Sequence, residues 1–347
     1  MHQMKKNEIK YLIIILFFSF LSVNILCAEN GSLMAYKERQ RDKAVALLGE
    51  MFNDPGGGRY VNGLNYLFIL QDPSFNLWEE IRQDALAYFR DNNIPWWEST
   101  AKIPPGHLLS SQIACVNHLF FLRNRKEFVV KILQNIDSRI VSAEEITYPD
   151  ADTGYVAFEI VGKENYLGEY QHTRGIYSTS VDAVMIGKKE DGKNILVLIE
   201  WKYTEDYEYG KSLYTPSRFR IYNPLLEATD SPFKTIIRNG KPFEPLYYEP
   251  YYELMRQTLL GWKMTSVNEY NCDEYIHLYI VPGENVELLL RNTSPGLAGN
   301  TISEIWQETL KTPTLFRIIS PENFLEPLKN ERGTQAFFAY LTHRYWN

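Results

Sequence analysis

The most informative hydrophobic pattern in the chain is an apolar run that ends abruptly in charge. Residues 195–199 read Ile-Leu-Val-Leu-Ile, and Glu200-Trp201-Lys202 follow directly. An unbroken apolar run predicts a strand that is covered on both faces. Side chains alternate along a strand, so Glu200 and Lys202 project to the same side. Burying two such charges is unfavourable unless they are paired or bind a metal, which makes this strand end a candidate site.

A second strand precedes this run and reaches it through a tight turn. Residues 180–187 are typical of a strand, and Asp191-Gly192 in the following turn is a strong hairpin signal. Asp182 lies in the first of these strands, so the hairpin can bring it near Glu200 if the strand register allows. The alternative is an ordinary surface charge pair at a strand end, which the all-apolar run disfavours.

Helical spacing of apolar residues predicts several helices around these strands. They are expected over residues 35–52, 75–92, 108–135, 250–265, 301–311, 322–329 and 333–345. Further strand-like sequence covers residues 139–162, 275–281 and 315–319. Residues 205–248 contain five prolines and are expected to be mostly loop.

The composition is that of a folded protein of ordinary polarity. Hydrophobic residues make up 45%, charged residues 23% and aromatic residues 14%, which argues against disorder. A chain of 347 residues can bury a large core in one big domain or two modest ones. The net charge of −7 counts against a protein that coats DNA through a basic face, although a local basic cleft can coexist with an acidic remainder. The three cysteines show neither zinc-site nor disulfide spacing.

The N-terminus allows two interpretations. Lys5 and Lys6 precede an apolar run over residues 11–28, which resembles a secretory signal peptide or a single membrane anchor. In that case residues 5–28 predict export or membrane anchoring. Alternatively, residues 1–33 are a wrongly assigned leader and translation starts at Met34, which predicts a cytoplasmic protein. We leave residues 1–33 out of the fold prediction.

The order of Asp182, a glycine turn and Glu200-Trp201-Lys202 resembles the signature of the PD-(D/E)XK nuclease superfamily. The wider pattern is similar to its bacterial restriction-endonuclease-like branch, over residues 108–282 and in weaker form from residue 35. A Glu-x-Lys triplet alone is weak, since Glu8-Ile9-Lys10 is another one. The resemblance implies an α/β fold, a restriction-endonuclease-like mixed central sheet flanked by helices. It divides the chain into an N-terminal helical region, 34–107, and a nuclease-like domain with a C-terminal helical extension, 108–347.

The resemblance also implies a Mg²⁺-dependent endonuclease that hydrolyses DNA phosphodiester bonds in restriction, defence or DNA processing, with Mn²⁺ able to substitute. Asp182 and Glu200 would hold the metal, because hard cations prefer oxygen ligands. Lys202 would assist attack by water, and Gln257 on the next helix would support the site. Further substrate contacts are expected from Arg256, Arg174, Gln112 and Asn117.

One departure from the family pattern leaves alternatives open. Many superfamily members carry a metal-binding Glu on an early helix, where this chain has Gln112 and Asn117. Substitutes for it are sought among Glu159, Glu164 and Glu169. The departure keeps open a nuclease-fold protein that binds nucleic acid without cutting it, and residues 5–28 keep open an exported surface or glycan-binding protein. DNA and a second copy of the chain are the expected partners, no small-molecule cofactor is expected, and membrane contact is expected only if residues 11–28 act as an anchor.

Overall fold

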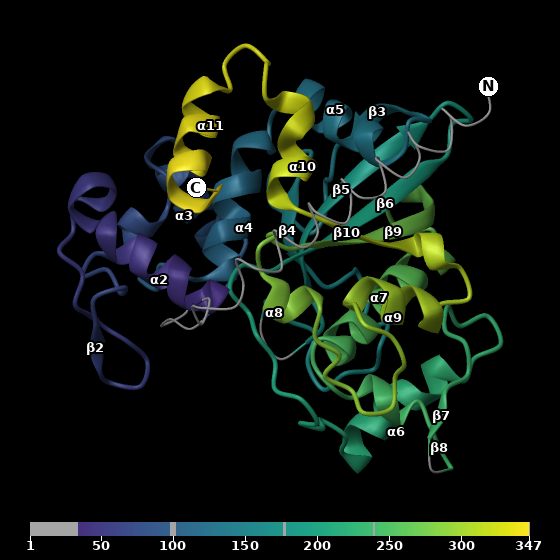
Figure 1. Cartoon of the computed structure of the whole chain (residues 1–347). Coiled ribbons are helices and arrows are strands. Elements are labelled where there is room, and N and C mark those ends of the chain that lie inside the picture. Colours follow the sequence, from purple (N-terminus) through teal and green to yellow (C-terminus); the bar gives the residue numbers. More distant parts are fainter. Residues whose placement is uncertain (1–33, 98–101, 176–177, 239, 347) are drawn as a thin grey trace, which may run out of the picture.

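The computed structural model describes residues 34–97, 102–175, 178–238 and 240–346, and the expectations for residues 1–33 lie outside these ranges. A six-stranded mixed sheet lies between helical layers (Figure 1). Its strands are β3 (Ile140–Glu144), β4 (Ala157–Ile160), β5 (Val181–Lys189), β6 (Asn194–Trp201), β9 (Cys272–Ile280) and β10 (Phe316–Ile319). The predicted α/β class and the predicted mixed sheet are confirmed.

The strand order of the sheet is β10-β9-β6-β5-β3. β6 runs parallel to β9, β9 runs parallel to β10, and β5 is antiparallel to β6. The far edge of β5 is shared by two strands, since β4 pairs with residues 181–184 and β3 pairs with residues 186–189. The predicted hairpin between β5 and β6 is confirmed, with Gly192 at φ +85° in its turn.

Helices cover both faces of this sheet (Figure 1). On one face lie α4 and α5, with α10 and α11 beside them, and on the other lie α7 and α9. The helices are α2 (Tyr36–Ala46), α3 (Glu79–Asp91), α4 (Ser111–Leu119), α5 (Lys126–Ile136), α6 (Pro216–Leu226), α7 (Tyr251–Ser266), α8 (Val286–Leu289), α9 (Ile302–Thr309), α10 (Pro321–Leu325) and α11 (Gln335–Leu341). Two short hairpins add β1 (Gly58–Arg59) with β2 (Asn65–Tyr66) and β7 (Ile237–Arg238) with β8 (Lys241–Pro242).

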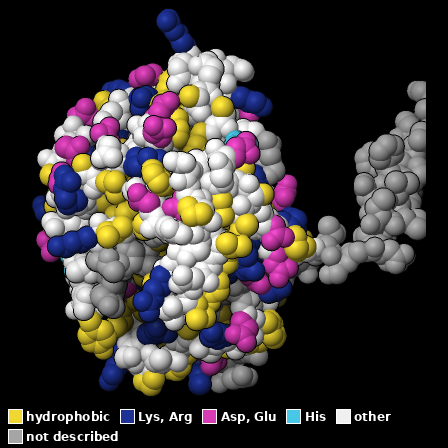
Figure 2. Space-filling view, turned by 90° about the vertical axis from the view of Figure 1, so that its left-hand side faces the viewer, with side chains coloured by type: hydrophobic (Ala, Val, Ile, Leu, Met, Phe, Trp, Pro, Cys, Tyr) yellow, Lys and Arg dark blue, Asp and Glu magenta, His cyan; other side chains and the backbone are white. Residues whose placement is uncertain are grey.

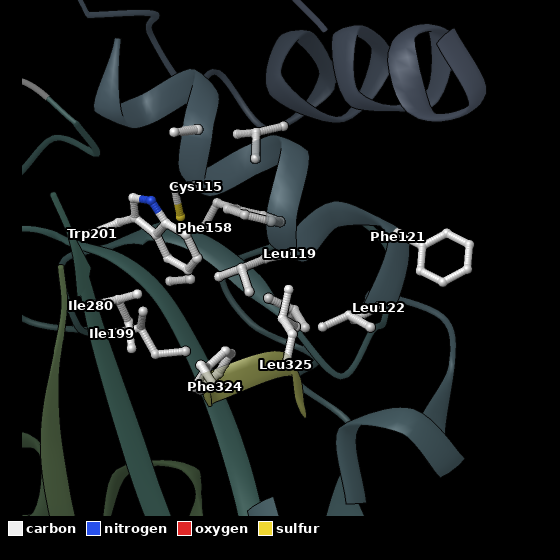
Figure 3. Close-up of a cluster of buried hydrophobic side chains, with 14 of the residues drawn as sticks. Cys115, Leu119, Phe121, Leu122, Phe158, Ile199, Trp201, Ile280, Phe324 and Leu325 are labelled. Carbon is white, nitrogen blue, oxygen red and sulfur yellow. The ribbon is translucent and has the colours of Figure 1, made fainter. Parts of the chain in front are cut away.

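Alternation along β6 divides its apolar side chains between two cores. Ile199 and Trp201 join the cluster on the α4 side, where they lie near Cys115 of α4 and Phe324 of α10 (Figure 3). Leu198 belongs to the second cluster, which lies on the α7 side. The even-numbered residues of β6 therefore point toward α7, which sets the direction of a side chain at position 200.

Helix α7 lies unusually close to β6 because it carries a glycine at the contact. A Cβ atom on Gly261 would come within 2.3 Å of Leu198 Cδ1 and 2.9 Å of Tyr275 Cδ2. No real side chain fits there, so glycine is the residue that permits this approach. Gln257 stands one helical turn earlier, at the end of β6.

The expectation that residues 205–248 are mostly loop is wrong at α6. Thr215 caps this helix by accepting a hydrogen bond from the Arg218 backbone N–H at 3.2 Å. Pro216 occupies the first turn, where its fixed φ and missing N–H are compatible with a helix. The other predicted helices and strands are confirmed, with shifts at their ends. Within the described residues, no helix has the length and apolarity to cross a membrane.

Candidate active site

A pocket of about 640 Å³ opens at the end of the sheet where β5 begins and β6 ends. This volume is in the range of small-molecule and substrate sites. The strands supply Asp182, Glu200 and Lys202 to its lining, and Gln257 of α7 and Gln112 of α4 complete it from the two helical layers. With Arg256, also of α7, the structure brings six of the predicted site residues into one pocket.

Asp182 and Glu200 face each other across the β5–β6 pair. Ala183 pairs with Ile199, and the same register sets Asp182 opposite Glu200, on the same side of the sheet. Asp182 Oδ2 accepts a hydrogen bond from the Trp201 backbone N–H at 2.7 Å. Burial, together with the charge of Glu159, raises the pKa of Asp182 to about 8. Burial and the charge of Asp182 likewise raise the pKa of Glu200 well above its ordinary value.

Lys202 is bound to two carboxylates. Its Nζ lies 2.6 Å from Glu200 Oε1 and 2.5 Å from Glu253 Oε2, and the residue is only 5% exposed. Burial alone would lower the pKa of Lys202, but the charges of Glu200 and Glu253 outweigh it and raise this pKa well above its ordinary value. The ammonium therefore stays charged at neutral pH, as a fixed positive group in the pocket.

Gln257 connects α7 to the ends of both strands. Its Nε2 donates to Glu200 Oε2 at 2.5 Å and to the Ser180 carbonyl oxygen at 3.1 Å. Its Oε1 is buried and finds no hydrogen-bond partner among the described residues. A buried acceptor without a partner is unfavourable in a finished core, so this oxygen is available to a ligand.

Glu159 brings a carboxylate into the pocket beside Gln112 of α4. It lies on β4, lines the pocket, and its Oε1 and Oε2 accept hydrogen bonds from Gln112 Nε2 at 2.7 Å and Ser180 Oγ at 2.9 Å. Burial raises its pKa despite these bonds. Its backbone φ of +53° is strained for a residue other than glycine, a condition found preferentially at functional sites. Glu159 is thus the only one of the proposed substitutes that contacts Gln112 directly.

The other two proposed substitutes lie in different surroundings. Glu169 lines the pocket, but its carboxylate accepts hydrogen bonds from the Thr179 backbone N–H at 2.7 Å and the Tyr222 hydroxyl at 2.6 Å. Glu164 is exposed and does not line the pocket. The Glu169 carboxylate is therefore held in the pocket lining by Thr179 and Tyr222, and Glu164 lies outside the pocket.

Of the expected substrate contacts, Arg256 lies in the pocket and two others do not. Arg174 is held beside the pocket by an ion pair with Asp150 at 2.9 Å and by hydrogen bonds to the Phe158 and Glu159 carbonyl oxygens. Asn117 is fully buried away from the pocket, where it accepts from the Trp78 backbone N–H at 2.8 Å and donates to the Asn76 carbonyl oxygen at 3.0 Å. Its amide is used in joining α4 to the N-terminal region.

Several pocket residues were not anticipated from the sequence. Glu253 contacts Lys202, and Glu249 lies one turn before it, with a pKa that burial and the charge of Glu253 raise to about 7. The four-residue spacing of Glu249, Glu253 and Gln257 was the available signal, because it places all three on one face around a helix start. Arg218 of α6 was hidden in the segment expected to be loop.

The pocket offers a divalent cation few oxygen ligands. Among the described residues, no group of three or more His, Cys, Asp or Glu side chains is arranged to hold a metal ion. Mg²⁺ in proteins is commonly bound through one or two carboxylates and keeps several waters, so it does not require such a group. Asp182 and Glu200 provide the carboxylates, and Gln257 Oε1 is a neighbouring oxygen without a partner. Crowded carboxylates with raised pKa values are the groups that a cation would stabilise.

A mixed sheet flanked by helices, with acidic and lysine side chains converging at the ends of two adjacent strands, defines a restriction-endonuclease-like protein. Residues 57–346 match the family described as restriction endonuclease associating with ARP, and the chain belongs to this family. Comparison with curated proteins and with solved structures found no match.

Proposed function

We propose that this protein is a Mg²⁺-dependent endonuclease that hydrolyses DNA phosphodiester bonds, with Asp182, Glu200 and Lys202 as its catalytic groups. The observation that carries the proposal is the meeting of the Asp182–Glu200 pair with the Lys202 ammonium in one pocket. Membership in a restriction-endonuclease family supports a nuclease and supports DNA as its substrate.

Each residue has a distinct task in this proposal. Asp182 and Glu200 hold the cation, which when bound polarises the scissile phosphate and lowers the pKa of a water molecule. Lys202 holds a fixed positive charge where negative charge develops on the phosphate oxygens. Gln257 fixes the orientation of Glu200 through its amide N–H and presents its free oxygen to the site. Arg256, which forms no ion pair within 4 Å among the described residues, contacts a phosphate of the bound strand.

The test is cleavage of plasmid and oligonucleotide DNA by purified protein with Mg²⁺, with Mn²⁺ and with EDTA. We expect cleavage with either metal and none with EDTA. Glu200→Gln and Lys202→Met should each lower the cleavage rate by at least ~100-fold, as the loss of a transition-state contact does. Lys193→Met is the matched control, because Lys193 is exposed in the β5–β6 turn.

Two results would contradict the proposal. Cleavage by both site variants at the rate of the unmodified protein would remove these residues from the chemistry. DNA binding without turnover in any divalent metal would instead favour a nuclease fold that binds nucleic acid without cutting it. Light scattering with and without DNA tests the expected homodimer.

A further inference from the structure

The depth of the site limits which form of DNA can reach it. Glu200 and Lys202 are only 4% and 5% exposed, so a phosphate that contacts them must descend into the pocket. The pocket volume of about 640 Å³ is that of a cube with an edge of ~9 Å, whereas the major groove of B-DNA alone is ~12 Å wide. The pocket is too small to take in a base-paired segment, which favours a reacting phosphate that arrives on a locally unpaired strand.

Two exposed aromatic rings stand at the pocket. We call Trp97 and Tyr170 the rim aromatics; they line the pocket, and they are 57% and 82% exposed. Among the described residues, no aromatic ring or cationic side chain packs on either of them. The Trp97 backbone N–H donates to Gln112 Oε1 at 2.8 Å, which ties this ring to the Gln112–Glu159 pair. Free ring faces beside a phosphate site are what unpaired bases stack on.

Two guanidinium groups provide positive charge in the same pocket. Arg218 of α6 and Arg256 of α7 lie 5.1 Å and 4.7 Å from the centre of the Tyr252 ring. Neither forms an ion pair with a carboxylate of the described residues, and Arg256 Nε has no hydrogen-bond partner there. Arg218 donates one hydrogen bond to the Leu213 carbonyl oxygen at 2.7 Å and Arg256 donates one to Thr179 Oγ1 at 3.3 Å. A guanidinium has five N–H donors, so each keeps others for backbone phosphates, which arginine binds well.

Neither the face of the molecule seen in Figure 2 nor the net charge of the chain favours binding of a long duplex. On the face shown in Figure 2, the described Lys and Arg side chains are interspersed with Asp and Glu side chains and form no continuous basic track. The chain as a whole carries a net charge of −7. Duplex binding depends mainly on neutralising many phosphates, whereas an unpaired strand gains much of its affinity from stacking.

We propose that the pocket takes an unpaired DNA strand, with bases stacked on Trp97 and Tyr170 and backbone phosphates on Arg218 and Arg256. This inference rests on the proposed nuclease function and names its substrate class. It requires single-stranded, bubble or flap DNA to be cut in preference to the same sequence as an intact duplex.

The experiment compares one fluorescent oligonucleotide as a single strand, as a perfect duplex and inside a bubble. Cleavage is measured with Mn²⁺, and binding is measured by anisotropy in EDTA with the Asp182→Asn protein. We expect the single strand and the bubble to be bound and cut at least ~10-fold better than the duplex. Tyr170→Ala and Trp97→Ala should each weaken binding of the single strand by roughly 10-fold, and Tyr170→Phe should restore it, because the ring and not the hydroxyl is used. Tyr209→Ala is the control, since Tyr209 is 64% exposed but does not line the pocket.

The outcomes separate this inference from the nuclease proposal. Equal binding and cutting of duplex and single strand, or unchanged affinity in both alanine variants, would overturn the inference and leave the nuclease standing. Absence of cleavage on every substrate would overturn the nuclease proposal. The ratio of the affinities for the single strand and the duplex, measured in EDTA, would then still decide whether the protein prefers unpaired DNA.

Discussion

Replacement of Asp182 by asparagine is expected to make the protein more stable while it removes activity. Asp182 is held among like charges in a desolvated pocket, and its pKa is raised from 3.8 to about 8. A carboxyl with a raised folded-state pKa stabilises the fold fully below its unfolded pKa, and this contribution is lost as pH rises through the folded pKa. A pH of about 7 lies ~3 pH units above the unfolded pKa, and each unit lowers the free energy of unfolding by up to ~1.36 kcal/mol. The carboxylate therefore destabilises the fold by ~4 kcal/mol at most.

Asparagine keeps the shape of this side chain without its charge. Its Oδ1 can accept the hydrogen bond that Asp182 Oδ2 accepts from the Trp201 backbone N–H at 2.7 Å. For 347 residues, an unfolding entropy of ~2.1 cal/mol/K per residue makes ~4 kcal/mol equal to a rise in Tm of ~5 °C. We expect a gain up to that size near pH 7, and a much smaller gain near pH 5, which is only ~1 pH unit above the unfolded pKa of 3.8.

The assay is thermal unfolding followed by circular dichroism, at both pH values, in EDTA and in Mg²⁺. Mg²⁺ should raise the Tm of the unmodified protein and have little effect on the variant, because a cation relieves the same repulsion. Asp273→Asn is the control, since Asp273 is an exposed aspartate on β9. A variant that is no more stable than the unmodified protein at the higher pH in EDTA, with the control also unchanged, would refute the electrostatic reasoning.

Three further predictions concern the fold around the site. Gly261→Ala should destabilise the protein by ~1–3 kcal/mol through overpacking, because its Cβ would lie 2.3 Å from a leucine methyl. Gly283→Ala is the control, since a Cβ there would meet nothing within 4 Å. Chemical denaturation measures both variants, and equal effects would refute the argument that only Gly261 is a close contact. Asp150→Asn should cost ~3–5 kcal/mol, because Asp150 is buried in ion pairs with two arginines at 3.1 Å and 2.9 Å, whereas Asp152→Asn, at a 64% exposed side chain, should have little effect in the same measurement. Burial lowers the pKa of His277 to about 3, so its contribution to stability is present above its unfolded pKa of 6.5 and is lost as pH falls toward 3. His277→Asn should lower the slope of the free energy of unfolding against pH by ~1.4 kcal/mol per pH unit in this range. An unchanged slope would show that His277 does not titrate on unfolding.

The meeting of acidic and lysine side chains could be predicted because it follows from short-range rules. The two-residue period of a strand put Glu200 and Lys202 on one side, and the Asp191-Gly192 turn brought Asp182 to them. These rules need no knowledge of the rest of the chain. These rules do not predict which residues of other strands and helices surround the strand ends, because those residues come from segments distant in sequence.

The parts that could not be predicted depend on long-range packing. Glu159 was one of three candidate carboxylates, and nothing in the sequence selected it, because a glutamate gives no signal for the left-handed backbone conformation that it adopts. Arg218 was hidden among prolines, although one of these prolines begins its helix. Asn117 was expected at the substrate because of its place on α4, but only the fold shows that its amide is used by the N-terminal region.

The shared edge of β5 separates β3, which extends the sheet away from the pocket, from β4, which carries Glu159 into it. β3 holds residues 186–189 and β4 holds residues 181–184, and the chain leaves the sheet between them. A small movement of β4 would carry Glu159 toward or away from the acidic pair without breaking a single β3–β5 hydrogen bond. The connection between β3 and β4 is held by the buried ion pairs of Asp150, so this residue ties the position of Glu159 to Arg123 and Arg174 independently of the long hairpin that aligns Asp182 with Glu200.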